Sequence, residues 1–494
     1  MRVGGTKRTV ARATAGALVG LVAMLALASV ASAKKYHVLI VSKTKTGSGY
    51  TSYYPTIQSA VEASKKGYWI LIEPGVYAEE VKVSKKHGGI YIRGMNRNTV
   101  IIDGENKSVE GGRNGIEVQK AKNVWIENLT VRNFDQGPTG GGGNEIWWNG
   151  GADSERIGAK GWYGAYLTAY DTGLNGAYGI FTNNETEGDW ENIYASGFND
   201  SGMYLGACPE CKAVINKATM EFNALGYSGS NSGGKLIIEN STFRHNSTGV
   251  APNSENPGDG PPPQNGACQH SRPLKHHRGS LPEFSTTEFE HCTIIRENLI
   301  TENSDLKTPA SGSAAAAPWG AGVLLPGDYG DLVENNTITN NASDGVLAFE
   351  YPNPFPPTKK TIYFQNAGNR VAGNKFSGNG KLGKSAQFEG DLVFEGGAFG
   401  TKTSTNDCAI GNTFTDPVFP AGIETTWGCQ NKTTPNPTPN GSEWGPGVQY
   451  LQALQAESEG RTQEPQAAPP EQETMPNPCE HVPNNPLCEG GKPR

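Results

Sequence analysis

Three residues with catalytic chemistry, Glu221, Arg244 and His245, stand at related places in the sequence. Glu221 lies five residues before Gly226, and Arg244 lies five residues before Gly249. If the chain repeats with that period, the two side chains lie beside each other on neighbouring repeats. A carboxylate beside an arginine and a histidine suits general acid–base catalysis. A structural ion pair is the alternative interpretation, and the sequence leaves both open.

Flat aromatic rings and short polar side chains form a second group of candidates. Aromatic rings suit the apolar faces of sugars. We predict that the residues of this group contact a polysaccharide: Trp147, Trp148, Trp162, Tyr166, Tyr204, Ser228 and Asn231. The alternative for the rings is that they pack on the flank of the protein and cover it.

The eight cysteines all follow the N-terminal segment, and an even number of them favours disulfides in an oxidising compartment. Because consecutive cysteines are close in sequence, we predict local pairs: Cys208 with Cys211, Cys268 with Cys292, Cys408 with Cys429, and Cys479 with Cys488. A redox or metal-binding pair is the alternative at "CPEC" (208–211). Only one such motif is present, and no βαβ pattern surrounds it.

A proline-rich stretch contains His270, His276 and His277. Copper binding is one interpretation of these imidazoles. We expect a solvated basic loop instead, because no spacing between potential ligands repeats. We therefore predict neither a bound metal nor a cofactor.

Glycines recur every 23 or 24 residues, at Gly179, Gly202, Gly226 and Gly249, and Gly322 and Gly345 are again 23 apart. This period fits a β-solenoid, whose rungs pair about 4.8 Å apart. We predict a corner in each rung, with a ladder of side-chain amides at Asn199, Asn223 and Asn246 and with the following glycine at positive φ.

Alternation after each glycine predicts which side chains face the core. The predicted inner row is Ile180, Met203, Tyr227 and Val250, and the predicted outer row is Phe181, Tyr204, Ser228 and Ala251. A further asparagine motif returns every 38 residues, at Asn298, Asn336, Asn374 and Asn412. This longer interval indicates rungs with added loops.

The two ends of the chain differ from the repeats. Residues 1–33 have a basic start, an uncharged run and "ASA" before Lys34, which predicts a signal peptide; an uncleaved membrane anchor is the alternative. A helix with Thr56 as its N-cap is expected to cap the solenoid, which we place at 34–430. Residues 431–494 are rich in Pro, Glu and Gln and are predicted to be a disordered tail.

Two stretches carry a resemblance to a known family. "TIQSAVEASKKGYWILIEPGVYAEEVKV" (Thr56–Val83) and "NVWIENLTVRN" (Asn123–Asn133) resemble the pectin lyase-like superfamily. This resemblance implies an all-β, right-handed parallel β-helix, a single-stranded solenoid. Pectate lyases, pectin methylesterases, alginate epimerases and NosD-like copper-accessory proteins share that fold, so the fold does not choose a reaction. We expect Glu79, in "GVYAE", to be a cap or turn residue.

The net charge of −7 and the lack of a basic block exclude nucleic acid as the expected partner. No later segment is apolar enough to span a membrane, so we expect a secreted or cell-envelope monomer. Our interpretation is a protein that binds an extracellular polysaccharide and, as a lyase, hydrolase or epimerase, modifies it. A non-catalytic surface scaffold is the alternative, followed by a NosD-like metal-accessory protein.

Overall fold

The computed structural model describes residues 37–45, 51–152, 157–254, 292–308, 319–349, 368–381, 389–395, 407–426 and 464–493, with isolated positions between them. The predicted signal peptide lies outside the described residues, as do Cys268 and the histidines of the predicted loop. None of the helices in the described ranges has the length and apolar character needed to cross a membrane.

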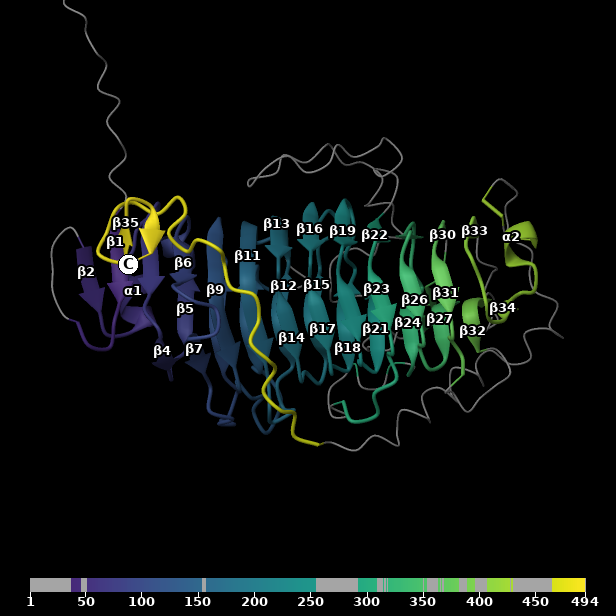
Figure 1. Cartoon of the computed structure of the whole chain (residues 1–494), viewed down its shortest axis with the longest axis horizontal. Helices are drawn as coiled ribbons and strands as arrows, with labels where there is room; N and C mark the ends of the chain where they lie inside the picture. The colour runs from purple at the N-terminus through teal and green to yellow at the C-terminus, as the bar shows by residue number, and fades with distance from the viewer. Residues whose placement is uncertain are drawn as a thin grey trace, which may run out of the picture. The chain divides into compact units, whose positions relative to one another are not determined.

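The chain winds into rungs whose strands stack as three parallel sheets, here named sheets I, II and III (Figure 1). Sheet I has eleven strands: β5 (Val81–Ser84), β8 (Asn114–Gln119), β10 (Asn144–Asn149), β12 (Tyr178–Asn183), β15 (Ser201–Gly206), β18 (Leu225–Ser230), β21 (Thr248–Asn253), β24 (Ala321–Pro326), β27 (Asp344–Phe349), β32 (Gly390–Glu395) and β34 (Val418–Phe419).

Sheets II and III share two long strands, β9 (Val124–Arg132) and β11 (Ala159–Tyr170), which pass from one sheet to the other. Sheet II also contains β2 (Thr51–Tyr54), β1 (Val38–Val41), β3 (Trp69–Ile72), β6 (Tyr91–Gly94), β13 (Glu185–Glu191), β16 (Ala213–Asn216), β19 (Leu236–Glu239), β22 (Thr293–Arg296), β25 (Leu332–Glu334), β30 (Arg370–Ala372) and β33 (Cys408–Ile410). Sheet III also contains β4 (Gly75–Tyr77), β7 (Val100–Asp103), β14 (Tyr194–Ser196), β17 (Thr219–Glu221), β20 (Thr242–Arg244), β23 (Leu299–Thr301), β26 (Thr337–Thr339) and β31 (Lys375–Ser377).

The inner row of sheet I lies at the centre of the core. Ile180 pairs with Met203, Met203 with Tyr227, and Tyr227 with Val250. All four side chains are completely buried, which confirms the predicted alternation. Burying side chains of this size stabilises the fold by roughly 1.5–3 kcal/mol each.

An asparagine ladder runs along the corner between sheets III and I. Asn223 Nδ2 donates to Asn246 Oδ1 at 3.1 Å, and the same contact continues through Asn303, Asn341 and Asn379 at 3.1, 2.9 and 2.9 Å. The ladder is therefore confirmed at Asn223 and Asn246. Asn199 does not join the ladder, because its Nδ2 donates to Gln136 Oε1 at 2.9 Å. The backbone N–H of Phe198 donates to Asn223 Oδ1 at 3.1 Å in its place.

A second ladder lies at the corner between sheets II and III. Asn298, Asn336, Asn374 and Asn412 bond in sequence at 3.1, 3.0 and 3.0 Å, which shows that the 38-residue interval is one rung. Glu424 of the short helix α2 (Ile423–Thr426) accepts the last bond at 2.9 Å.

The predicted reason for the repeated glycines was wrong. Gly202, Gly226 and Gly249 lie inside strands and do not have positive φ; the left-handed residues are the ones just before the asparagines, such as Phe222 at 59° and His245 at 54°. A Cβ at Gly226 would stand 2.4 Å from the carbonyl oxygen of Gly249. The glycines are therefore needed for close approach between rungs rather than for a turn.

The predicted capping helix is α1 (Ile57–Ala63). Thr56 is its N-cap and accepts a hydrogen bond from the backbone N–H of Ser59 at 3.1 Å. Glu79 accepts the backbone N–H groups of Ile57 and Gln58, both at 2.9 Å, so it is a cap residue as expected. The short 3₁₀ helix η1 (Lys85–His87) follows β5.

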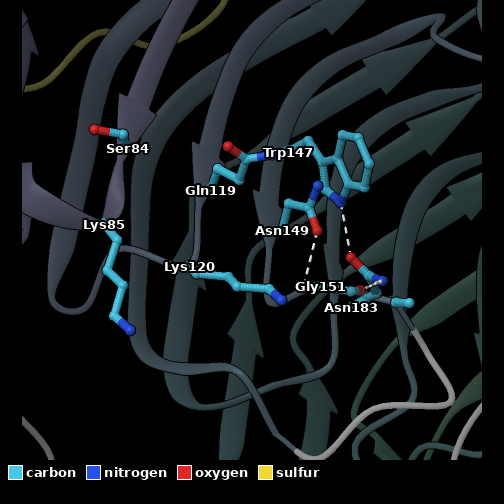
Figure 2. Close-up of a pocket in the computed structure, with 9 residues that line it drawn as sticks. Ser84, Lys85, Gln119, Lys120, Trp147, Asn149, Gly151 and Asn183 are labelled. Carbon is cyan, nitrogen blue, oxygen red and sulfur yellow. Dashed lines mark hydrogen bonds between the residues drawn. The ribbon is translucent and has the colours of Figure 1, made fainter.

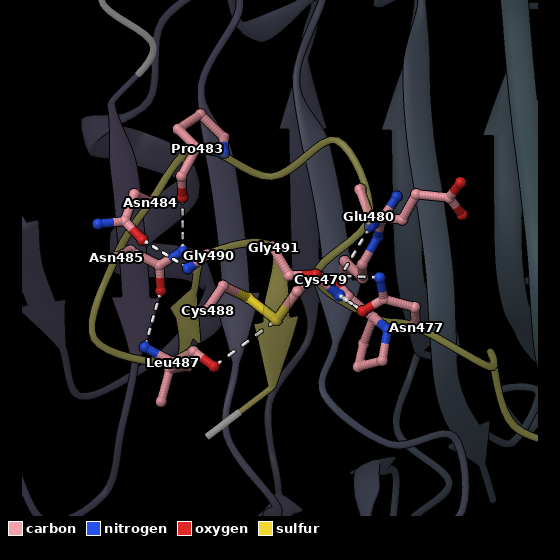
Figure 3. Close-up of a disulfide and its surroundings, with 12 residues drawn as sticks. Asn477, Cys479, Glu480, Pro483, Asn484, Asn485, Leu487, Cys488, Gly490 and Gly491 are labelled. Atoms are coloured by element: carbon pink, nitrogen blue, oxygen red, sulfur yellow. Dashed lines mark hydrogen bonds between the residues drawn. A yellow bond between two sulfur atoms is a disulfide. The ribbon is translucent and has the colours of Figure 1, made fainter.

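The tail prediction does not hold for residues 464–493, which lie along the solenoid as the yellow trace in Figure 1 shows, from Glu464, which pairs with Lys307, to Cys488 at the first strands. The Cys479–Cys488 disulfide closes a loop, and β35 (Cys488–Glu489), which begins at the end of this loop, pairs with β36 (Lys492–Pro493) (Figure 3). Cys479, Val482 and Cys488 form one apolar cluster with Val38, Ile40, Trp69 and Leu71. Composition suggested disorder, but the disulfide loop buries enough apolar surface to fix this segment.

Three of the four predicted disulfides are confirmed, with S–S distances of 2.09 Å for Cys208–Cys211, 2.15 Å for Cys408–Cys429 and 2.00 Å for Cys479–Cys488. The fourth prediction involves Cys268, which lies outside the described residues.

Apart from the three sheets, a short antiparallel pair of strands joins β28 (Tyr351–Pro352) to β29 (Tyr363–Phe364).

Candidate functional site

The predicted catalytic group is only partly assembled. Glu221 and Arg244 pair in register on β17 and β20, and Arg244 Nε donates to Glu221 Oε2 at 2.7 Å. The hydroxyl of Tyr194 donates to the other oxygen of Glu221 at 2.8 Å. His245 instead faces Glu302 at 3.8 Å and stacks on Phe222. Both oxygens of Glu221 are thus held by neighbours, an arrangement that favours the ion-pair interpretation.

Two of the predicted sugar-contacting aromatic residues belong to the core. Trp148 and Trp162 are completely buried and pack with Trp190, at ring-centroid distances of 6.0 and 4.8 Å. Trp148 Nε1 also donates to the carbonyl of Val124 at 3.3 Å. These two residues therefore pack inside the core, rather than contacting a sugar or covering the flank of the protein.

The outer row of sheet I is also covered. Tyr204 is 7% exposed, Ser228 is 5% exposed and Asn231 is completely buried. The ring of Tyr204 packs edge-on against Phe181 at 5.0 Å. These predicted contact residues therefore do not form an open groove in the structure.

Trp147 is the one predicted sugar-contacting residue among those that line the pocket shown in Figure 2. The pocket has a volume of about 710 Å³, within the range usual for ligand sites. It lies beside the ends of β8, β10 and β12 and is lined by Ser84, Lys85, Gln119, Lys120, Trp147, Asn149, Gly151, Ala152 and Asn183.

Strand register explains why three side-chain amides meet in this pocket. Asn149 pairs with Gln119 on one side and with Asn183 on the other, because each is the last residue of its strand. Trp147 lies two residues before Asn149, on the same face of β10. Its indole stacks in parallel on Phe181, with centroids 5.0 Å apart and planes 4° from parallel.

Hydrogen bonds fix the polar groups of the pocket. Trp147 Nε1 donates to Asn183 Oδ1 at 2.8 Å, and Asn183 Nδ2 donates to the carbonyl of Gly151 at 3.0 Å. Asn149 accepts the N–H of Gly151 at 2.9 Å and donates to Glu117 Oε1, also at 2.9 Å. The amides are therefore oriented before any ligand arrives.

Two lysines supply positive charge to the pocket. Lys85 comes from η1, directly after β5, and Lys120 follows β8 in a left-handed conformation with φ of 50°. Ammonium groups attract carboxylate or sulfate groups, and amides bond hydroxyl groups. The pocket thus combines an aromatic ring, oriented amides and cations.

Of the residues that line this pocket, only Trp147 was predicted from the sequence. The available signal was a polar residue at the end of each successive sheet I strand. Gln119, Asn149 and Asn183 are separated by 30 and 34 residues, so a search for the period of 23 residues passes over them.

Buried carboxyl groups gather at another corner, away from the pocket lining. Burial, followed by the charge of Asp171, raises the pKa of Asp135 to about 6. Burial also raises the pKa of the fully buried Glu145. Asp171 accepts the backbone N–H groups of Gly173 and Asn175 at 2.9 and 2.7 Å and so holds a turn. Across the described ranges, no group of His, Cys, Asp and Glu residues has the arrangement of a metal site.

No protein-family model matches the chain, and no curated protein matches it. Solved structures do match. The A-module of mannuronan C-5 epimerase AlgE4 from Azotobacter vinelandii is 14% identical, with a TM-score of 0.40, and the match covers 72% of this chain and 89% of that one.

Two other matches span similar shares of the chain. Pectin methylesterase PemA from Erwinia chrysanthemi is 12% identical, with a TM-score of 0.36 over 70% of this chain and 90% of that one. A tailspike protein of E. coli bacteriophage HK620 is 12% identical, with a TM-score of 0.42 over 76% of this chain and 58% of that one. At these identities the likeness concerns the parallel β-helix alone, which the strand pairing also shows directly.

Proposed function

We propose that this protein binds an acidic polysaccharide in the pocket at the ends of β8, β10 and β12, outside the cytoplasm. The observation that carries the proposal is the meeting of Trp147, three side-chain amides and two lysines in one pocket. The three disulfides support an oxidising, extracytoplasmic location.

Each group of the pocket has a role in this proposal. Lys85 and Lys120 attract the carboxylate or sulfate groups of an acidic sugar. The amides of Asn149 and Asn183 bond its hydroxyl groups, and Trp147 contacts an apolar ring face. Because hydrogen bonds already orient the amides and the indole, little conformational entropy is lost on binding.

Calorimetry with the full chain tests this proposal. We expect oligogalacturonate to bind and a neutral galactose oligomer of the same length to bind at least about tenfold more weakly. Lys85→Ala combined with Lys120→Ala should weaken oligogalacturonate binding by about tenfold and reduce its salt dependence. The control is Lys375→Ala, an exposed lysine on β31 of sheet III. Equal losses in the control and in the pocket variant would refute the proposal.

A catalytic step on the bound polysaccharide is a separate proposal, and Glu221, Arg244 and His245 remain its candidates. The occupied carboxylate of Glu221 supports the non-catalytic alternative, a binding or scaffold protein. An assay for new reducing ends and unsaturated products separates the two. Turnover that Glu221→Gln abolishes would support an enzyme, whereas binding without turnover would support the alternative.

A further inference from the structure

Arg97 is a buried cation at the turn between β6 and β7, and it is only 3% exposed. Its Nε donates to Thr168 Oγ1 at 2.7 Å, its Nη1 donates to the carbonyl of Glu473 at 3.0 Å, and its Nη2 donates to the carbonyl of Leu167. All three acceptors are neutral oxygens. Among the described residues, no carboxylate forms an ion pair with Arg97.

Arg93, on β6 and four residues before Arg97, shows how a buried arginine is usually accommodated. It is also buried, but its guanidinium lies 2.6 Å from the carboxylate of Glu127. Buried charges in proteins are normally paired in this way, because an isolated charge loses its hydration. Burial lowers the pKa of Arg97 to about 9, with the charge of Glu473 opposing the shift, and burial also lowers the pKa of the paired Arg93, to about 10.

Tyr166 lies near Arg97 and also near the carboxylates of Glu191 and Glu473, all of which act electrostatically on its hydroxyl group. It stands where β11 passes from sheet II to sheet III and has a φ of 52°. A bulky residue in this conformation is strained, and such strain concentrates at functional sites. The side chain is half-buried. Tyr166 is also one of the sugar-contacting residues that the sequence predicts.

A segment of the C-terminal region, residues 472–475, covers Arg97; we name it the strap. Asn98 Oδ1 accepts the N–H of Gln472 at 3.0 Å, and Asn98 Nδ2 donates to the Gln472 carbonyl at 2.8 Å. Thr474 and Met475 both donate to Asn128 Oδ1, at 2.8 and 2.9 Å. The strap is thus held by a few hydrogen bonds. It offers the Arg97 guanidinium the carbonyl of Glu473 and the Arg97 backbone N–H the hydroxyl of Thr474 at 3.2 Å, and the charge of the Glu473 carboxylate acts on Arg97 from beyond ion-pair distance.

We propose that Arg97, Thr168 and Tyr166 form a second binding site, for the carboxylate of a uronic-acid sugar, and that the strap competes with this ligand. The sugar carboxylate pairs with Arg97 and displaces the carbonyl of Glu473. Its hydroxyl groups take over hydrogen bonds that the strap makes, and Tyr166 contacts the sugar ring. The site is independent of the pocket lined by Trp147.

The test uses the full chain with the pocket disabled by Lys85→Ala and Trp147→Ala, so that pocket binding does not contribute. Oligogalacturonate is the probe, and a galactose oligomer of equal length is the neutral control. Amide hydrogen exchange at residues 472–480 reports strap displacement, and calorimetry reports affinity. We expect the acidic probe, and not the neutral one, to raise exchange in the strap.

Three substitutions sharpen this test. Asn98→Ala removes both bonds to Gln472 and leaves the contacts of Arg97 in place, so affinity for the probe should rise about tenfold. Asn240→Ala, which removes an exposed amide bond to Asn216, is the matched control and should not change it. Arg97→Met keeps the side-chain volume and should abolish the response.

The result that overturns the proposal is unchanged strap exchange at millimolar probe in the chain with Asn98 intact. A response of equal size in Arg97→Met would overturn it as well. If the Asn98→Ala variant does not fold, the exchange measurement on the chain with Asn98 intact still decides. A failure of the pocket proposal would appear separately, as unaltered binding after Lys85→Ala and Lys120→Ala.

Discussion

The rungs that carry the asparagine ladder and the rungs that form the pocket are stacked alike but connected differently. From Asn223 onward, the corner between sheets III and I repeats one contact, from amide to amide, over five residues. In the pocket rungs the strands also pair in register, and Gln119, Asn149 and Asn183 are aligned in the same way. The ladder amides bond one another at intervals of 23, 57, 38 and 38 residues, whereas Asn149 and Asn183 bond Glu117, Trp147 and Gly151 and line the pocket.

Substituting the two adjacent tryptophans of β10 gives the largest expected contrast. Trp148→Ala should lower the free energy of unfolding by about 3–5 kcal/mol, because it leaves a cavity in the core. Trp147→Ala should cost much less stability and should weaken oligogalacturonate binding. Chemical denaturation and calorimetry check the two effects. Equal destabilisation by both substitutions would mean that Trp147 is a core residue as well.

A glycine of the periodic rungs provides the next test. Gly226→Val should cost about 3 kcal/mol, because its Cβ would meet the carbonyl of Gly249 at 2.4 Å and the rungs would have to separate. Gly411→Ala is the matched control, since Gly411 has a φ of 68° but no atom within 4 Å of the added Cβ. This control should cost about 1 kcal/mol from backbone strain alone. Thermal and urea unfolding measure both.

The glycines also show which parts of the fold the sequence could predict. Their spacing predicted the solenoid, the inner row and the register, because stacked rungs place equivalent residues at equal intervals. The conformation of the glycines was wrong, since a turn and a close approach between backbones both select glycine. Only the structure showed that Phe222 and His245, rather than the glycines, have the left-handed backbone conformation at the corner.

The strap could not be predicted, for a different reason. The contacts of Arg97 with Glu473 and of Asn98 with Gln472 join residues more than 370 positions apart. Contacts between an early rung and a distant segment leave no periodic trace in one sequence. The local disulfide Cys479–Cys488 was predicted, but the surface on which its loop packs was not.

Breaking the ladder at its middle should have an intermediate effect. Asn303 donates to Asn341 and to the carbonyl of Phe243, and it accepts both the backbone N–H and the Nδ2 of Asn246. Asn303→Ala should therefore destabilise the fold by about 2–3 kcal/mol, because buried partners are left unsatisfied. Asn240→Ala, which removes an exposed amide bond and places alanine at a φ of 50°, should cost only about 1 kcal/mol, mainly from backbone strain. A similar loss for both would show that the ladder does not stabilise the corner.

The smallest effect is expected at Asp135, in the region without the ladder. Burial and the charge of Asp171 raise its pKa to about 6, Glu145 lies in the same buried acidic group, and Arg113 opposes the shift. The ordinary value in an unfolded chain is about 3.9. Between these two pH values the folded protein binds more protons than the unfolded chain, so stability should fall as the pH rises from about 4 to about 6.

Asp135→Asn should remove this part of the pH dependence. Above pH 6 the variant should be more stable than the parent by about 1 kcal/mol, after allowance for screening by solvent, and near pH 4 the two should be equal. Urea unfolding at several pH values from 4 to 7 measures the difference. Asp171 and Glu145 are present in both proteins, and because both interact with Asp135 the measured difference includes the change in their titration when that charge is removed. A variant that is less stable than the parent at pH 7 would show that the ionised carboxylate stabilises this corner, opposite to the effect argued from its burial.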